Sequence, residues 1–257
     1  MNSDVESIHL KMPVWSGIFA TAASAAAQIS EHERLFELKT WLQRQHALAR
    51  STAEHFRHSR GCEGARPSTL PLIMAASSAN EVVGLGGGSG WAYLLLEGLG
   101  IAPARYIVLE LPAVVNYFEQ HSRTGVEFRE VGAPVSFSRG HVDVMYANSA
   151  LQYMPDNEPL MQQVIKLQPR LLLIDELLWT SGNVDWFTIQ RNSDVSVVAR
   201  FASLSALEEQ LANLGMRRMW TGAFGVGHLG YCFPEMSNFP SHLAVDHAKA
   251  LLFIRGE

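Results

Sequence analysis

The pattern of apolar and polar positions divides the chain into two regions. In the first, up to about residue 68, apolar residues recur at helical spacing, as between Leu35 and Leu42. The alanine-rich stretch Ser16–Ala27 is expected to form a further helix, because it is apolar but too short to span a bilayer. Two glycines and a proline between Arg60 and Ser68 indicate a loop. We therefore expect residues 1–68 to form an N-terminal helical cap.

The second region, residues 69–257, alternates short apolar runs with helical stretches. Five of these runs are expected to be strands: Glu81–Leu85, Tyr106–Glu110, Val126–Val131, Val142–Ala147 and Arg170–Asp175. Strands separated by helices predict a parallel sheet with right-handed crossovers. Four of the runs are apolar enough to be buried on both faces, as in the middle of a doubly wound sheet.

The last part of the chain has a different order of elements. An amphipathic helix over Ser203–Leu214 precedes two strands, Met216–Thr221 and Ala248–Arg255, which we expect to pair antiparallel at the edge of the sheet. The predicted fold class is therefore α/β, with a Rossmann-like, doubly wound, mostly parallel seven-stranded sheet. Residues 69–257 are expected to form one compact unit beside the helical cap.

Composition narrows the class of protein. Of the 257 residues, 47% are apolar and 18% are charged, which is typical of a soluble enzyme with a full core. A net charge of -5 gives no general attraction to polyanions, so we expect no nucleic-acid partner. The two cysteines, Cys62 and Cys232, have no CxxC spacing and suggest reduced thiols in a cytoplasmic protein. Because apolar runs stay short of about 18 residues, we expect no membrane span.

The strongest chemical signal is a glycine-rich loop after the first strand of the second region. Its sequence, Leu85-Gly86-Gly87-Gly88-Ser89-Gly90, lies between that strand and the helical run Trp91–Leu99. Glycines let the backbone approach a ligand closely, and the helix start aims amide groups at it. Glu110 follows Gly90 by twenty residues, at the end of the next strand, where ribose hydroxyls are held in such folds. The dense GxGxG spacing favours an adenosyl ligand with its amino-acid and ribose parts over the loop.

These residues resemble a known family. The segment Glu81–Gly90 resembles the first motif of class I S-adenosylmethionine-dependent methyltransferases. Further segments resemble, in order, a family of methyltransferases of unassigned substrate, which are often encoded near polysaccharide or natural-product pathways: Tyr106–Pro112, Val142–Tyr153, Leu171–Asp175 and Phe187–Gln190, with Trp15-x-Gly17 before them.

The resemblance implies S-adenosylmethionine as the cofactor and gives roles to individual residues. The loop would contact its methionine and ribose parts, through Leu85, Gly86, Gly87, Gly88 and Gly90. Glu110 would bind the ribose hydroxyls and Leu111 would flank the adenine. Asn148 and Ser149 would lie near the sulfonium, and Gln152 and Tyr153 would line the floor between cofactor and substrate.

The residues that would act on the substrate are less clearly marked. If the acceptor is a hydroxyl, a base must take its proton, and we expect candidates in Asp175, Glu176 and His58. The resembling family has an arginine after the aspartate, whereas this chain has Glu176. Trp179 is a candidate substrate contact among several aromatic residues. His55 and His58 share one helix face, but with no third ligand we expect no metal site.

The leading hypothesis is a methyltransferase that acts on a small molecule, a sugar or a specialised metabolite. One alternative is a methyltransferase-fold enzyme that catalyses a non-methylating step, such as cyclisation or elimination. Another is a non-catalytic binding subunit, and a third is an NAD-dependent oxidoreductase, against which the dense glycine spacing counts. A homodimer through the N-terminal helices stays open, because no heptad or exposed stripe requires it.

Overall fold

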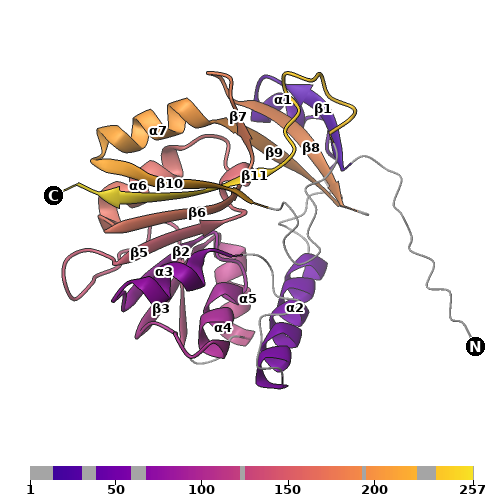
Figure 1. Ribbon diagram of the computed structural model, residues 1–257. Coiled ribbons are helices and arrows are strands. Elements are labelled where there is room, and N and C mark those ends of the chain that lie inside the picture. Colours follow the sequence, from indigo (N-terminus) through magenta and orange to yellow (C-terminus); the bar gives the residue numbers. More distant parts are fainter. Residues whose placement is uncertain are drawn as a thin grey trace, which may run out of the picture.

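The protein contains a large sheet flanked by helices and a smaller sheet at one end of it (Figure 1). The computed structural model describes residues 14–30, 39–58, 68–121, 125–192, 195–224 and 236–256. Among these residues, no helix is long and apolar enough to cross a membrane.

The large sheet has seven strands in the order β10-β11-β6-β5-β2-β3-β4. Their bounds are Glu81–Leu85 (β2), Arg105–Glu110 (β3), Val126–Glu130 (β4), Val144–Asn148 (β5), Leu171–Leu177 (β6), Met216–Phe224 (β10) and Ala248–Arg255 (β11). Strands β4, β3, β2, β5 and β6 pair in parallel, and β11 lies antiparallel between β6 and β10. The predicted mostly parallel seven-stranded sheet, with its antiparallel final hairpin, is confirmed.

Helices cover both faces of this sheet, as the buried strands require. Neighbouring residues of a strand point to opposite faces, so Val82 packs in one core cluster and Val83 in the other. The first cluster includes residues of α3 (Leu70–Ala76), α4 (Trp91–Gly98) and α5 (Pro112–His121). The second includes residues of α6 (Glu158–Leu167) and α7 (Leu204–Asn213). The chain is therefore doubly wound.

The N-terminal region differs from the predicted helical cap. The stretch Ser16–Ala27, expected as one helix, forms strand β1 (Trp15–Phe19) and the short helix α1 (Ala22–Ala26), which Thr21 caps. Strand β1 forms because it pairs antiparallel with a strand some 170 residues later, and this tertiary pairing overrides the helical pattern. The long helix α2 (Lys39–His58) agrees with the predicted helical spacing and packs against α4. The division at residue 68 stays a prediction.

A second sheet was not predicted. It has the order β1-β8-β9-β7, with β7 (Trp179–Thr180), β8 (Trp186–Asn192) and β9 (Val195–Ser203) inserted between β6 and α7. Because β7 directly follows the carboxyl end of β6, this sheet lies beside the carboxyl edge of the large sheet (Figure 1). Its core includes the stacked rings of Trp186 and Phe201, with centroids 4.1 Å apart.

A buried arginine connects the second sheet to the segment between β5 and α6. Arg200 of β9 is 1% exposed, and its guanidinium donates to Asp185 Oδ2 at 3.0 Å and to Asn157 Oδ1 at 2.8 Å. It also donates to the carbonyl oxygen of Leu151 at 3.3 Å. Burial lowers the pKa of Arg200, and the nearby Asp185 carboxylate opposes this effect. The short 3-10 helix η3 (Leu151–Tyr153) is therefore tied to the inserted strands.

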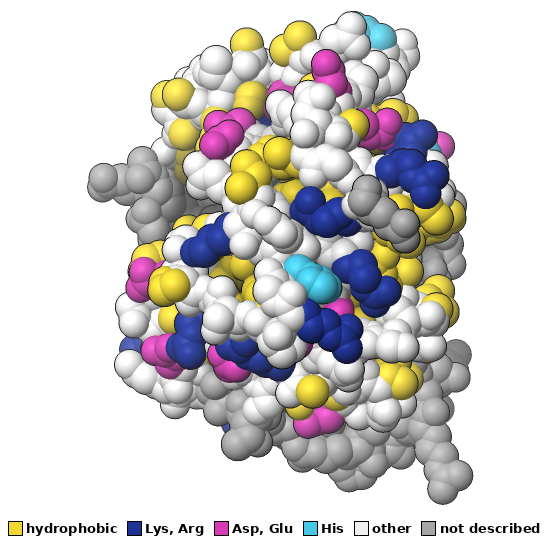
Figure 2. Space-filling model, turned by 90° about the vertical axis from the view of Figure 1, so that its left-hand side faces the viewer, with side chains coloured by type: hydrophobic (Ala, Val, Ile, Leu, Met, Phe, Trp, Pro, Cys, Tyr) yellow, Lys and Arg dark blue, Asp and Glu magenta, His cyan; other side chains and the backbone are white. Residues whose placement is uncertain are grey.

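Positively charged side chains lie close together at the amino-terminal ends of the parallel strands. Figure 2 shows the side on which the parallel strands begin, with several Lys and Arg side chains near one another. Arg139, Arg170 and Arg217 are exposed and lie shortly before or at the start of β5, β6 and β10. The sequence spaces these cations widely, and the fold brings them to one side, away from the glycine loop.

Helix α3 offers a matched test of its packing. Leu70 is fully buried and Leu72 is 72% exposed. We expect Leu70→Ala to lower the free energy of unfolding by about 2–5 kcal/mol, because it leaves a cavity in the core. Leu72→Ala should change it by less than about 0.5 kcal/mol. Urea unfolding of both variants measures the difference, and equal losses would contradict the placement of α3.

Arg200 allows a second stability test. Arg200→Met would leave Asp185 and Asn157 without their buried donor, so we expect the free energy of unfolding to fall by about 3–5 kcal/mol. The control is Arg217→Met on β10, which removes an exposed arginine and should cost less than about 0.5 kcal/mol. Thermal and urea unfolding measure both, and a neutral Arg200→Met would show that the buried network contributes no net stability.

Candidate functional site

The glycine loop after β2 has a backbone that only glycine adopts easily. Gly86 and Gly88 have φ values of 64° and 55°, in the left-handed region. A Cβ atom at Gly86 would lie 2.6 Å from the Cβ of Ala150, so the loop packs directly against the segment after β5. A Cβ at Gly88 would meet no heavy atom within 4 Å. The loop is therefore closed on one side and borders open space at Gly88.

Glu110, at the end of β3, lies beside this open space. Its Oε1 accepts a hydrogen bond from the Gly88 N–H at 2.9 Å, and its Oε2 accepts one from the Leu111 N–H at 2.9 Å. The residue is 9% exposed, and burial raises the pKa of its carboxyl group, while the two backbone hydrogen bonds partly offset this shift. Leu111 is half exposed. Gly88, Glu110 and Leu111 therefore meet at one place, and their binding of a cofactor stays a prediction.

The end of β5 forms the neighbouring wall, because β5 pairs with β2. Ser149 has a φ of 52°, which is rare for a residue other than glycine and often marks functional sites. Gln152 Nε2 donates to Ser149 Oγ at 2.7 Å, and Asn148 Nδ2 donates to the hydroxyl of Tyr146 at 2.6 Å. The contact between Ala150 and Gly86 joins this wall to the loop. Asn148 and Ser149 thus lie at the same sheet edge as the glycines.

The two other predicted substrate residues point to the second sheet and to β11. The Tyr153 hydroxyl donates to Gln190 Oε1 of β8 at 3.0 Å. The Trp179 indole N–H donates to the carbonyl oxygen of His247 at 3.0 Å, and Lys249 Nζ lies 4.0 Å from the centre of the Trp179 ring. Tyr153 therefore connects η3 with the inserted strands, whereas Trp179 is held against the start of β11.

Asp175 has a position that differs from the one expected of a catalytic base. It is 1% exposed and accepts hydrogen bonds from the Thr69 N–H at 2.8 Å and the Thr69 hydroxyl at 2.6 Å. The hydroxyls of Tyr146 and Ser68 also donate to it, at 3.2 and 3.4 Å. Burial raises the pKa of Asp175, and these donors partly offset the shift. The carboxylate thus anchors the start of α3, and a catalytic role for it stays a prediction.

The structure describes only some features of the remaining catalytic candidates, Glu176 and His58. Glu176 has a φ of 55°, at a register irregularity between β6 and β11. His58 is the last residue of α2, and its side chain lies outside the described residues, as does that of His55. Among the described residues, no group of three or more His, Cys, Asp or Glu side chains could hold a metal ion.

Sequence reasoning missed Arg200 and Gln190, the residues through which the second sheet holds η3. Gln190 lies in a segment noted only for its resemblance. Arg200 did carry a signal, because it is a charged residue within the apolar strand Val195–Ser203. A charge in such a run is usually paired when it is buried.

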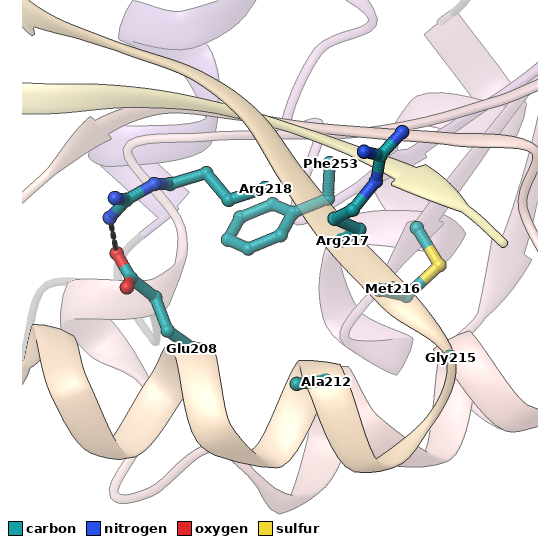
Figure 3. A pocket seen from close by; sticks show the side chains of 7 residues that line it. All are labelled: Glu208, Ala212, Gly215, Met216, Arg217, Arg218 and Phe253. Carbon is teal, nitrogen blue, oxygen red and sulfur yellow. Dashed lines mark hydrogen bonds and ion pairs between the residues drawn. The ribbon is translucent and has the colours of Figure 1, made fainter.

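One hollow of the described surface lies away from the glycine loop. It has a volume of about 490 Å³ and lies between α7 and the edge strand β10 (Figure 3). Arg218 and Glu208 form an ion pair across one end of it, and Phe253 also lines it. The predicted cofactor and catalytic residues are all outside its lining, so it is not part of the candidate site.

Comparisons with known proteins agree with this fold. No protein-family model matches the chain, and no curated protein matches it. A Haloferax volcanii protein, described as a candidate methyltransferase in complex with the Trm112 methyltransferase activator, is 14% identical with a TM-score of 0.53. The match covers 88% of this chain and 98% of that chain.

Two further solved structures are similar. A Listeria monocytogenes protein, described as a candidate S-adenosylmethionine-dependent methyltransferase, is 9% identical with a TM-score of 0.50, over 73% of this chain and 97% of that chain. LepI, in complex with SAH and a substrate analogue, is 17% identical with a TM-score of 0.50, over 86% of this chain and 54% of that chain. At these identities the similarity shows the fold alone: a Rossmann-like α/β methyltransferase fold with a mostly parallel seven-stranded sheet.

Proposed function

We propose that the protein binds S-adenosylmethionine at the glycine loop and transfers its methyl group to a small-molecule acceptor. The observation that carries the proposal is the open space at Gly88. The Glu110 carboxylate lies beside it, with Oε1 2.9 Å from the Gly88 nitrogen. A carboxylate next to a loop whose backbone a ligand can approach closely suits a ligand with ribose hydroxyls. When bound, the cofactor supplies an electrophilic methyl group on its sulfonium.

Each wall of the space has a role in this proposal. Gly86, Gly87, Gly88 and Gly90, with Leu85 before them, would hold the methionine and ribose parts. Glu110 would accept hydrogen bonds from the ribose hydroxyls, and the half-exposed Leu111 would cover the adenine. Asn148 and Ser149 would lie toward the sulfonium, because β5 ends beside β2. All of these residues come from the carboxyl edge of the parallel strands, where ligands bind in open α/β sheets.

The acceptor side would be formed by η3 and the second sheet. Gln152 and Tyr153 lie on η3, which Arg200 and Gln190 hold from β9 and β8. This wall is suited to positioning an acceptor, and positioning supplies much of the rate of a displacement reaction. Asp175 is engaged by four donors, and Glu176 and His58 are the other candidates for a base that takes a hydroxyl proton. Sugars and specialised metabolites are the proposed acceptor class.

The first test is binding of S-adenosylmethionine and S-adenosylhomocysteine by calorimetry. Gly88→Asp should lower both affinities by at least about tenfold, because its side chain would enter the open space. The control is Gly140→Asp, at a glycine with a φ of 76° and equally free surroundings, outside the candidate site. We expect it to bind like the parent. No binding to the parent would overturn the proposal.

The pH dependence of binding tests the role of Glu110. Burial raises the pKa of Glu110, and ribose hydroxyls donate best to its ionised form. Binding therefore favours loss of the proton, and affinity should fall as the pH decreases through this raised pKa. Glu110→Gln should remove that pH dependence and lower the affinity about 10- to 100-fold. Glu119→Gln, an exposed change on α5, should keep the parent profile in the same titration.

Methyl transfer itself is tested by the products. Incubation with S-adenosylmethionine and candidate sugar or metabolite acceptors should yield S-adenosylhomocysteine together with a methylated acceptor, measured by mass spectrometry. Turnover that requires the bound cofactor but leaves it unchanged would instead support the non-methylating alternative.

A further inference from the structure

A cavity of about 290 Å³ lies between α2, α4, α5 and β4, on the helix side of the glycine loop. Its apolar walls come from three elements, with Leu94 on α4, Phe118 on α5 and Phe128 on β4. Ser89 and Gly90 close it at the start of α4. Concave sites with aromatic walls and a few polar groups are typical of small-molecule binding.

The aromatic walls are held in place by one another. The rings of Phe118 and Phe128 are stacked, with centroids 5.6 Å apart. His121 stacks on Tyr117 at 4.4 Å, and its Nδ1 lies 2.6 Å from the Tyr117 carbonyl oxygen. The ring of His46 meets that of His121 edge to face at 5.6 Å. Phe118 and Phe128 are 2% and 3% exposed, so they form a fixed base beneath the cavity, and the accessible rings of its lining are those of His46, Tyr93 and His121. An aromatic ring can pack on such rings.

The polar lining of the cavity is basic. Arg50 lies on α2 at its rim, beside His46 and His121 of the lining, and the described lining residues include no aspartate or glutamate. Arg50 is exposed and makes no ion pair with a described residue. A guanidinium binds a carboxylate through two parallel hydrogen bonds, so an arginine that pairs with none of the described carboxylates can bind a ligand with one such group.

We propose that this cavity is a second binding site, for a small aromatic carboxylate. The ring would lie among His46, Tyr93 and His121, and the carboxylate would lie at Arg50. The site is separate from the proposed cofactor site, since Gly88, Glu110, Leu111 and the end of β5 do not line it. Only the loop residues Ser89 and Gly90 border both.

The test uses cinnamate as the probe, in calorimetry and saturation-transfer NMR with the full chain and no cofactor. We expect cinnamate to bind with a Kd below about 1 mM, and the uncharged cinnamamide to bind at least about tenfold more weakly. Arg50→Gln should lower the cinnamate affinity by at least about tenfold. Arg44→Gln removes the same charge from an exposed position of α2 outside the cavity, and should leave the affinity unchanged.

A variant that fills the cavity tests whether cinnamate binds inside it or only to exposed positive charge. Val126→Trp places a large ring in the lining and should abolish binding, while circular dichroism checks that the fold is kept. The proposal is overturned if cinnamate does not bind, if Arg44→Gln weakens binding as much as Arg50→Gln, or if S-adenosylhomocysteine displaces the probe. Because the probe is titrated without cofactor, failure here and failure of S-adenosylmethionine binding are distinguishable.

Discussion

A steric constraint at Gly86 governs the arrangement of the candidate site. The glycine loop lies against the segment after β5, at a separation that leaves no room for a side chain at position 86. This contact brings together groups from three parallel strands: the open backbone at Gly88, the carboxylate of Glu110 and the left-handed turn at Ser149. Any residue with a Cβ there would separate β2's loop from β5's end and widen the space between them.

The second sheet supports the carboxyl edge of the large sheet, where the candidate site lies. It reaches η3 through a buried guanidinium and through the hydrogen bond between Tyr153 and Gln190. Desolvating Arg200 is costly, and the partners of its two Nη atoms offset that cost in part, because its buried Nε has no hydrogen-bond partner among the described residues. The position of η3 thus depends on residues that are distant in sequence, because it follows β5 of the large sheet and is held by side chains of the second sheet.

How far the sequence predicts this fold depends on the range of the interactions. The strands of the large sheet are short apolar runs with a local signal, and β11 has the predicted bounds, Ala248–Arg255. Strand β1 and the second sheet were missed, because β1 forms only through its pairing with β8. In the candidate site, the glycines and Glu110 were predictable from residue type and spacing. The anchoring of Asp175 was not, since its donors at Ser68 and Thr69 lie 107 and 106 residues earlier in the chain.

The pairing of β1 with β8 also constrains the order in which the protein is completed during synthesis. Trp15 pairs with Gln190, so the first strand waits for a partner about 175 residues later. At typical elongation rates that delay is about 10 to 35 seconds. During this time Trp15, which is 2% exposed in the folded protein, has no native place to bury its ring. The nascent chain therefore carries an unpaired aromatic segment until the inserted strands leave the ribosome, and such long-range pairing is slow to form.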